Sequence, residues 1–405
     1  MEQSVFTIID RVDDVDGLRR VLSEMGSDPS DNDVLPLGQL ERAHFASLTV
    51  RTGDRPLLVF ELNVDGSIDD TIAGLVDIPE LASGVAEIFG RCTGWPGAGP
   101  VAYLTEHVQR PAAFHIGNTG RSRSRTRDEA VLVAGIETRI DDAQAAAELP
   151  GSVGGVATLV RNGATEDAPW AFEDPGPNVG MLDRVGRWLR VVPAVVPLVA
   201  IVVTSPYLLV KEARDRADWT PPPPVDPELA ADLEAAEDRV GSIQNHMLSI
   251  VDIKPGPYRR MILRSVLFVI ERLARALFIH GKLGSISTIH FAHWAIIDDG
   301  RSLMFLSNFD GSWESYLDDF IEKVSHGLTA VWSSCDGFPP ARFLIGEGAT
   351  HGPEFKAWAR ASMHPTLVWY QAYPTLGVTD IDLNSRVRRG LGSRPKDEGA
   401  WLDEL

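Results

Sequence analysis

The most informative feature of this chain is a pattern of residues that occurs twice. The copies are HFASLTVRTGDRPLLVFELNVDGSIDD, from His44 to Asp70, and HFAHWAIIDDGRSLMFLSNFDGSWESYLDD, from His290 to Asp319. Each copy begins with His-Phe-Ala and ends an apolar run with Asn-x-Asp-Gly-Ser. Each is followed by Cys-x-Gly-aromatic-Pro, once at Cys92 and once at Cys335. Two ordered motifs at nearly equal spacing indicate an internal duplication.

The residues around the first copy predict one compact unit. Alternation of apolar and polar residues predicts strands, and an apolar period of three to four residues predicts helices. The expected elements are a strand Val5–Arg11, a helix Asp16–Met25, a hairpin of His44–Val50 and Pro56–Val64, a helix or broken helix Ser67–Arg91, and a strand Val101–Val108. This order of elements is that of the ferredoxin-like fold.

The second copy predicts the same order. Its expected elements are a strand His246–Lys254, a helix Tyr258–Phe278, a hairpin of Thr288–Ile297 and Ser302–Phe309, a helix Trp313–Trp332, an added helix Glu354–Met363, and a strand Leu367–Tyr373. Each sheet has one bare face left to bury, so the two sheets are expected to pack face to face. The predicted fold is α+β, with ferredoxin-like repeats at residues 1–140 and 242–390 packed as an intrachain pseudo-dimer, and a tail at 391–405.

Residues 141–241 separate the repeats and match neither copy. Their centre is the uncharged stretch Val191–Val210, which at ~1.5 Å per residue would reach ~30 Å, the thickness of a bilayer's hydrocarbon core. Three prolines, at positions 193, 197 and 206, argue against an uninterrupted straight helix. A single crossing would place the repeats on opposite sides of the membrane, where they could not pack together. We therefore expect a monotopic anchor on one membrane face, with a buried core or oligomer-interface segment as the alternative.

Composition narrows the function classes. A formal net charge of −19 argues against a nucleic-acid-binding surface, because phosphate contacts need basic patches. The two cysteines form neither a disulfide framework nor a CxxC metal site, which fits a reducing compartment. The N-terminal residues lack the basic and apolar regions of a signal peptide. Together with the apolar segment, these features predict a protein at the cytoplasmic face of the cell membrane that contacts lipid through residues 191–210.

The repeated histidine, asparagine and aspartate are the strongest candidates for chemistry. A tight turn at Asp299 would place His290 opposite Phe309, so that Asn308 and Asp310 become its diagonal neighbours. A histidine beside a carboxylate can act as a general acid–base pair or as an oriented metal or haem ligand.

An architectural role is the alternative for the same residues. Asp-Gly-Ser after a strand commonly caps the next helix through side-chain oxygens. The first copy retains the set as His44, Asn63 and Asp65. A single catalytic site seldom needs two copies of its residues, so this retention favours architecture.

Two fused ferredoxin-like units resemble the dimeric α+β-barrel superfamily, whose haem branch includes dye-decolorizing peroxidases and chlorite-dismutase-like proteins. Asn308-Phe309-Asp310-Gly311 is similar to the Gly-x-x-Asp-Gly motif of dye-decolorizing peroxidases, although Ser307 stands where that motif has its first glycine. The resemblance implies a haem cofactor with Asp310 as the distal acid, assisted by Asn308. It also implies an axial histidine, for which His290 and His326 are the candidates, and an arginine that no motif locates.

Three functions are compatible with these features. The first is a membrane-associated, haem-dependent, peroxidase-like oxidoreductase that acts on a hydrophobic small molecule. The second is a non-catalytic lipid-binding or scaffold protein tethered to a membrane. The third is a cofactor-free oxygenase or isomerase that uses His290 and Asp310 directly. The fold alone does not choose among them, and it leaves oligomer formation open.

Overall fold

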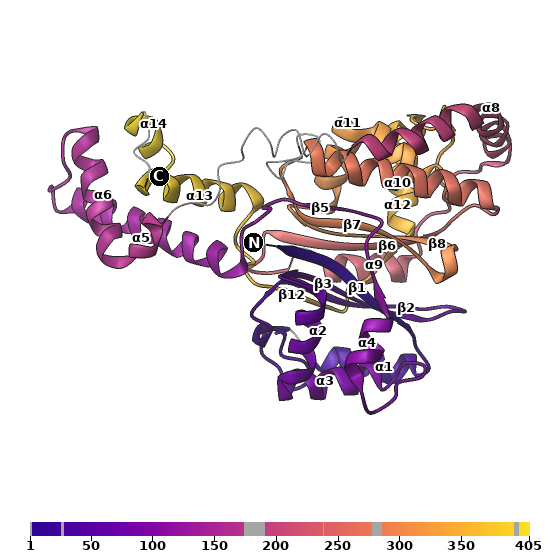
Figure 1. Cartoon of the computed structure of the whole chain (residues 1–405), viewed down its shortest axis with the longest axis horizontal. Helices are drawn as coiled ribbons and strands as arrows, with labels where there is room; N and C mark the ends of the chain where they lie inside the picture. Colours follow the sequence, from indigo (N-terminus) through magenta and orange to yellow (C-terminus); the bar gives the residue numbers. More distant parts are fainter. Residues whose placement is uncertain (1, 26–27, 174–190, 238, 278–285, 393–396) are drawn as a thin grey trace.

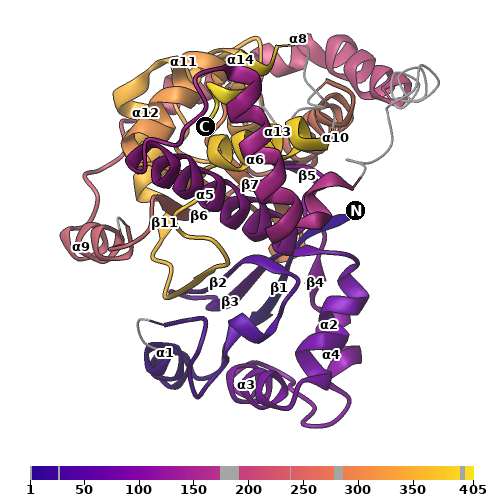
Figure 2. The same cartoon turned by 90° about the vertical axis from the view of Figure 1, so that its left-hand side faces the viewer.

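The computed structural model describes residues 2–25, 28–173, 191–237, 239–277, 286–392 and 397–405. It is a mixed α/β structure in which two five-stranded antiparallel sheets lie face to face (Figure 1). Helices cover the outer face of each sheet, and a further group of helices extends sideways from this body (Figure 1). The same arrangement, seen from the side that carries the extension, is shown in Figure 2.

The first sheet is built around the hairpin of the first sequence copy. In spatial order its strands are β12 (Val368–Gln371), β2 (Ala43–Arg51), β3 (Leu57–Asp65), β1 (Gln3–Arg11) and β4 (Val108–Gln109). Every neighbouring pair is antiparallel. β2 and β3 are buried along almost their whole length, β3 as a largely apolar run and β2 with the polar residues His44, Ser47 and Thr49 also buried.

The second sheet repeats the first, position by position. Its strands, in the corresponding order, are β5 (Ala113–Ile116), β7 (Ile289–Ile297), β8 (Ser302–Asp310), β6 (Gln244–Asp252) and β11 (Met363–His364). The hairpin of the second sequence copy thus occupies the same place as the hairpin of the first. A small separate hairpin is formed by β9 (Ala341–Arg342) and β10 (Gly346–Glu347).

Each sheet takes one edge strand from the other half of the chain. β12, near the C-terminus, pairs with β2, whereas β5, from the N-terminal half, pairs with β7. The expected closing strands were therefore wrong in two respects. The segment predicted as a strand at 101–108 is mostly helix α4 (Pro100–Glu106), and the strand predicted at 367–373 does not close its own sheet. As a result, neither half of the chain contains a complete sheet.

The second hairpin has the predicted register except at its histidine. Pairs run from Phe291 with Asn308 to Ile297 with Ser302. A β-bulge at His290 then shifts the register, so that Ile289 rather than His290 faces Phe309. The first hairpin has a bulge at the same place, between Ala43 and Phe45. Because a bulge re-aims side chains, the two histidines are displaced from the regular alternation in the same way.

Separate groups of helices cover the two outer faces. The first sheet is covered by α1 (Val15–Glu24), α2 (Ile68–Asp77), α3 (Pro79–Phe89) and α4. The second is covered by α10 (Pro257–Leu277), α11 (Trp313–Trp332), α12 (Gly352–Ala361) and α9 (Pro227–Ala236). The predicted caps are present, since the hydroxyls of Ser67 and Ser312 accept hydrogen bonds from the backbone N–H groups of Asp70 and Ser315. Short 3-10 turns lie at Leu37–Gln39, Pro169–Phe172, Val192–Ala194, Asp298–Gly300 and Gly348–Thr350.

The sideways extension, called the arm below, contains helices from both halves of the chain. They are α5 (Arg123–Ala145), α6 (Val153–Asp167), α13 (Val378–Gly392) and α14 (Glu398–Leu402). The arm has its own apolar core and a buried ion pair in which Arg388 donates to Glu129 over 2.6 Å. The domain boundaries predicted at residues 140 and 390 fall inside α5 and α13.

The apolar segment of the sequence forms α8 (Val195–Asp218), which lies on the outer side of α10 (Figure 1). The expectation that its prolines would interrupt the helix is wrong. Pro193 lies in the preceding 3-10 turn, and Pro197 lies in the first helical turn, where a backbone N–H has no partner within the helix. Only Pro206 lies inside the helix, and the chain continues as helix through it.

Candidate functional site

The structure brings His290 and Asp310 together at the bulge. His290 Nε2 lies 2.7 Å from Asp310 Oδ1, and the imidazole is almost completely buried. The other carboxylate oxygen of Asp310 accepts a hydrogen bond of 2.8 Å from the backbone N–H of Val378, the first residue of α13. The carboxylate therefore links the histidine to the start of the helix that follows the exchanged strand β12.

The first half of the chain contains the same arrangement. His44 Nε2 lies 3.1 Å from Asp65 Oδ1, and Asp65 Oδ2 accepts a hydrogen bond of 2.8 Å from the backbone N–H of Arg123. Arg123 is the first residue of α5, which follows the exchanged strand β5. A carboxylate at a helix N-terminus is favoured by the free N–H groups and by the helix dipole. Both histidine–aspartate pairs thus anchor the arm to the hairpins.

Tyr373 lies between the two pairs. Its hydroxyl is 2.8 Å from Nδ1 of His44, and its ring centroid is 6.0 Å from that of His290. Burial raises the pKa of Tyr373 well above its ordinary value, so the phenol stays protonated and can donate to His44. Aromatic rings of Phe45 and Phe291 fill the remaining space.

Asn308 takes no part in the His290–Asp310 contact. Its side-chain amide donates to Glu61 over 3.3 Å, and its carbonyl accepts a bond of 2.8 Å from the indole of Trp369. Asn308 therefore belongs to a different polar group, which lies between the two sheets.

Glu61 is the centre of this second group, which the sequence analysis did not identify. Its carboxylate is fully buried and lies 3.0 Å from His246 Nε2, 3.1 Å from the hydroxyl of Ser47 and 3.7 Å from His293 Nδ1. Glu61 and Ser47 come from the first sheet, and both histidines come from the second. We call Glu61, Ser47, His246, His293 and Asn308 the intersheet cluster.

The charges of the intersheet cluster are strongly shifted. Burial alone would raise the pKa of Glu61, but its hydrogen bond and electrostatic interaction with His246 outweigh burial and hold the pKa at about 2. Burial lowers the pKa of His293 to about 4, so this imidazole is neutral at pH 7. Neither nitrogen of His293 makes a hydrogen bond with the described residues. The cluster therefore holds a charged carboxylate among buried polar partners from both sheets.

His326 lies far from this chemistry in the fold. It is an exposed residue of α11, which covers the outer face of the second sheet, whereas His290 packs against Phe45 of the first sheet. The two histidines considered as iron ligands are therefore on opposite sides of one sheet.

The surroundings of His290 do not fit a haem. The ring is 1% exposed, its Nε2 is engaged by Asp310, and the rings of Phe45 and Tyr373 lie against it. None of the four cavities identified among the described residues is lined by His290. An axial ligand needs a free imidazole nitrogen with a macrocycle beside it. No reaction step is therefore assigned to a haem at this position.

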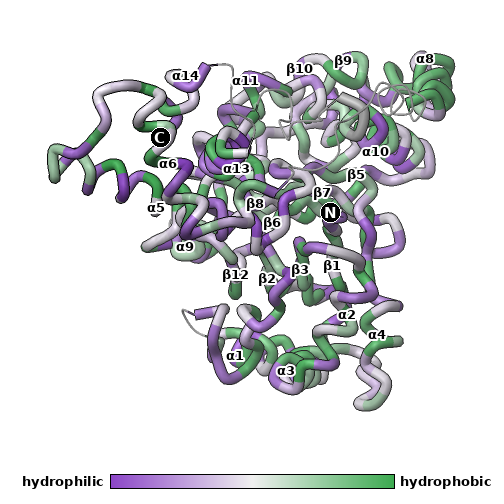
Figure 3. Tube along the Cα trace, turned by 60° about the vertical axis from the view of Figure 1, so that its left-hand side comes forward, coloured by the Kyte–Doolittle hydropathy of each residue, from purple (hydrophilic) through white to green (hydrophobic). Residues whose placement is uncertain are grey.

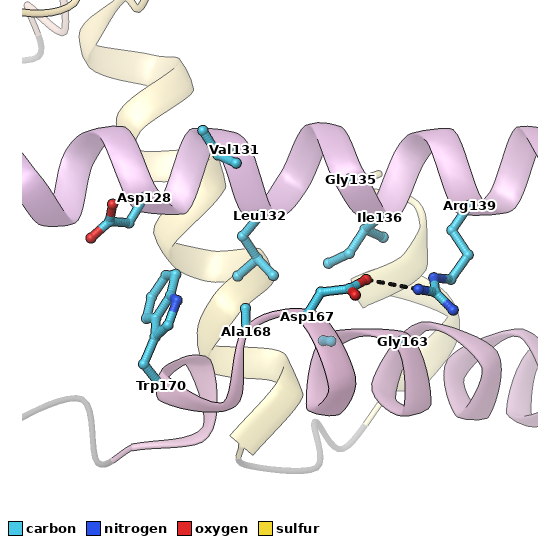
Figure 4. A pocket seen from close by; sticks show the side chains of 11 residues that line it. Asp128, Val131, Leu132, Gly135, Ile136, Arg139, Gly163, Asp167, Ala168 and Trp170 are labelled. Carbon is cyan, nitrogen blue, oxygen red and sulfur yellow. Dashed lines mark hydrogen bonds and ion pairs between the residues drawn. The ribbon is translucent and has the colours of Figure 1, made fainter.

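One of these cavities lies in the arm, between α5 and α6 (Figure 4). It has a volume of about 280 Å³ and is lined largely by aliphatic residues and glycines, with Trp170 at one end. Arg139 and Asp167 are paired with each other across it at 2.7 Å (Figure 4). Because these two charges are paired with each other, neither is free to bind a charged ligand in the cavity.

The outer surface of α8 is the most unusual feature of the exterior. Among the described residues, one helix, Val192–Asp218, is long and apolar enough to cross a membrane, and only 11% of its most apolar window is buried in the protein. Within residues 192–218 the exposed large apolar residues are Val192, Val195, Val196, Leu198, Val199, Val202, Val203, Tyr207, Leu209 and Val210. In Figure 3 the trace of α8 is coloured as hydrophobic along much of its length. A core helix of a soluble protein would be mostly buried instead.

The β9–β10 hairpin adds apolar residues beside α8. Phe343 and Ile345 at its tip are 58% and 50% exposed. Glu212 of α8 accepts hydrogen bonds from the backbone N–H groups of Phe343 and Leu344, at 2.9 and 2.7 Å. We call the exposed apolar residues of α8 together with Phe343 and Ile345 the α8 surface.

Polar contacts fix α8 to α10, to the segment before α10 and to the β9–β10 hairpin. Asp215 pairs with Lys254 and Arg259, and Arg216 pairs with Glu347 at 2.6 Å. The hydroxyl of Tyr258 donates to the backbone carbonyl of Thr204 over 3.0 Å. The apolar residues are thus held on a rigid support.

Comparison of the chain with protein-family models, curated proteins and solved structures gave no match. The resemblance to the dimeric α+β-barrel superfamily therefore stays a prediction, and function must be inferred from the geometry of this chain.

Proposed function

We propose that this protein is a monotopic membrane-surface protein that binds a lipid bilayer through the α8 surface. The observation that carries the proposal is the row of exposed aliphatic side chains on a helix that is otherwise fixed to the protein, with Val196 74% and Val203 72% exposed. Contiguous exposed apolar patches on soluble proteins mark interaction sites. Burial of a valine or leucine side chain contributes about 1.5–3 kcal/mol, so several together would support stable association.

Cations border the α8 surface although the whole chain is acidic. Lys211 and Arg214 follow the apolar part of α8, and Arg342 precedes the hairpin tip. Glu347 pairs with both Arg216 and Arg342, and Asp215 pairs with both Lys254 and Arg259. Each of these two groups contains two cations and one carboxylate, so each keeps a net positive charge. Cations beside an apolar helix favour contact with anionic lipid head groups.

An in-plane orientation is favoured over a crossing because of the exchanged strands. β5 precedes α8 in the chain and pairs with β7, which follows it. A helix that crossed the bilayer would separate these two strands. With α8 in the membrane plane, both sheets stay on one side. Location at the cytoplasmic face remains a prediction from the sequence.

We propose in addition that each half of the chain derives from a ferredoxin-like unit. Support comes from the matched strand orders, from the equivalent bulges at His44 and His290, and from the equivalent histidine–aspartate pairs. On this proposal, the pairs are conserved between the halves because each anchors one helix of the arm. This favours the non-catalytic, lipid-binding hypothesis over acid–base chemistry at His290.

Vesicle flotation tests the membrane proposal. Wild-type protein is expected to float with vesicles of phosphatidylcholine and phosphatidylglycerol, and the double variant Val196→Glu/Val203→Glu is expected to stay in the soluble fraction. The matched control is Val131→Glu/Val153→Glu, which places two carboxylates on exposed valines of the arm and should float like wild type. Equal behaviour of all three proteins, floating or not, would refute the proposal.

A further inference from the structure

An apolar groove runs along the inner flank of α8. It has a volume of about 460 Å³, within the range of small-molecule sites, and opens to the exterior. Leu198, Val202 and Leu209 of α8 form one wall, and Val266 and Ile270 of α10 face them. The floor includes Ala330 of α11.

The tip of the β9–β10 hairpin forms part of the groove lining. Phe343 and Leu344 both have positive φ, at 52° and 69°, a conformation that residues with side chains seldom adopt. Glu212, which is 6% exposed, holds both backbone N–H groups and so fixes this conformation. Leu344 is buried and Phe343 is exposed, and both line the groove. A strained backbone conformation persists only where the surrounding structure holds it, and here the buried carboxylate of Glu212 does so. The positions of Phe343 and Leu344 in the groove lining are therefore fixed by the fold.

Polar side chains line the groove at two positions, Ser205 and His326. His326 is exposed and carries ring nitrogens that can donate to an anion. Lys211 follows the lining residue Leu209 by two positions, and Arg342 directly precedes the lining residue Phe343. A ligand suited to this arrangement has a long apolar part and an anionic head.

We propose that the groove binds one acyl chain of an anionic phospholipid, with the head-group phosphate beside His326. This inference rests on the proposed membrane association, because Leu198, Val202 and Leu209 belong both to the groove and to the α8 surface. A lipid in the contacted bilayer could therefore move an acyl chain into the groove without exposing it to water. The protein would then hold a single lipid in addition to resting on the membrane.

Gly327 provides a selective test. It lines the groove on α11, and a Cβ added there would meet no atom within 4 Å, so Gly327→Leu is chosen to reduce the volume of the groove. Gly135→Leu is the matched control, because Gly135 lines the arm cavity and is equally open. Both changes replace glycine inside a helix with a better helix former, so both variants are expected to fold.

Native mass spectrometry with a lysophospholipid that carries a phosphoglycerol head group measures the binding without a bilayer. Wild type and Gly135→Leu are expected to bind one lipid per chain, and Gly327→Leu is expected to bind none. His326→Ala should weaken binding of the phosphoglycerol lipid roughly ten-fold, since a hydrogen bond to a charged group is lost. His326→Gln, which keeps a donor, should recover part of the affinity.

The outcomes separate this inference from the proposed function. Gly327→Leu should still float with vesicles, because the exposed face of α8 is unchanged. Absence of lipid from wild type, or equal binding by Gly327→Leu, would overturn the groove assignment whatever the flotation result. If wild type does not float with vesicles but binds one lysophospholipid per chain, the membrane proposal is overturned and the groove assignment stands.

Discussion

In most proteins polar side chains are exposed and large apolar side chains are buried. The space between the two sheets reverses this rule for polar residues, and the α8 surface reverses it for apolar residues. Between the sheets, Glu61, His246 and His293 are completely or almost completely buried. On α8, Val196 and Val203 are among the most exposed residues of their type. The buried carboxylate has partners from both sheets, whereas the valines face the exterior. Buried polar groups with internal partners stabilise the fold, whereas contiguous exposed apolar groups indicate a surface that binds another molecule or a membrane.

The largest expected effect tests the buried side of this comparison. Glu61→Ala removes the buried acceptor shared by His246 Nε2, the Ser47 hydroxyl and the Asn308 amide, although each of these residues keeps another hydrogen-bond partner. We expect unfolding free energy to fall by about 3–5 kcal/mol, the usual loss when one partner of a buried pair is removed. Urea denaturation at pH 7 measures it. Glu61→Gln, which keeps the shape and an acceptor, should lose less, and a loss below about 1 kcal/mol for Glu61→Ala would contradict a structural role for the cluster.

Acid should weaken the same interface. The folded pKa of His293, about 4, is below its ordinary value of 6.5, so its contribution is complete above pH 6.5 and is lost as the pH falls to about 4. The folded pKa of Glu61, about 2, is below its ordinary value of 4.5, so its contribution is lost between about pH 4.5 and 2. Each loss is of the order of 3 kcal/mol by linkage. Both groups therefore act in the same direction.

Denaturation curves recorded from pH 7 to pH 4 check the histidine part of this dependence. His293→Phe removes the titrating group and keeps an aromatic ring of similar shape, so its stability should change less over this range than that of wild type. A variant with the wild-type pH dependence would show that other groups cause the acid sensitivity.

A smaller effect is expected at the histidine–aspartate pairs. Asp310→Ala and Asp65→Ala each remove one helix-capping carboxylate and one partner of a buried histidine. We expect each to lower the unfolding free energy by about 1–2 kcal/mol, as for loss of a cap. The exposed Asp31→Asn is the control and should be neutral. Similar losses at the two aspartates would support a shared structural role, whereas a stable Asp310→Ala with a stability cost only at Asp65 would sharpen the case for chemistry at His290.

The sequence allowed both hairpins to be predicted, together with the register of the second from Phe291 to Ile297, because a duplicated pattern and a period of two are local signals. The proximity of His290 and Asp310 was also predicted, but the bulge that displaces His290 from Phe309 was not. The exchange of β5 and β12 could not be predicted, since alternation shows that a strand exists but not which strand it pairs with. β5 is also only four residues long, too short to give a clear pattern.

One residue of the intersheet cluster, Glu61, could have been identified from the sequence. Glu61 interrupts the apolar run LLVFELNV, where a charged residue must either reach solvent or find a buried partner. His246 and His293 could not be assigned to it from sequence, because they lie in other strands and meet Glu61 only when the sheets pack. The continuity of α8 through Pro206 could not be predicted from the sequence, because a proline inside a helix removes a backbone hydrogen bond and usually kinks or ends the helix.

The smallest effect on stability is expected at the α8 surface, and this contrast completes the comparison. Val196→Glu/Val203→Glu changes two side chains that are more than 70% exposed, so the unfolding free energy should stay within about 0.5 kcal/mol of wild type. The same substitutions should abolish flotation, while Glu61→Gln should lower stability and leave flotation of the folded fraction intact. Urea denaturation and flotation of both variants provide the four measurements. A loss of several kcal/mol from the α8 variant would place its valines in a packed interface and remove the reason to assign them to a membrane.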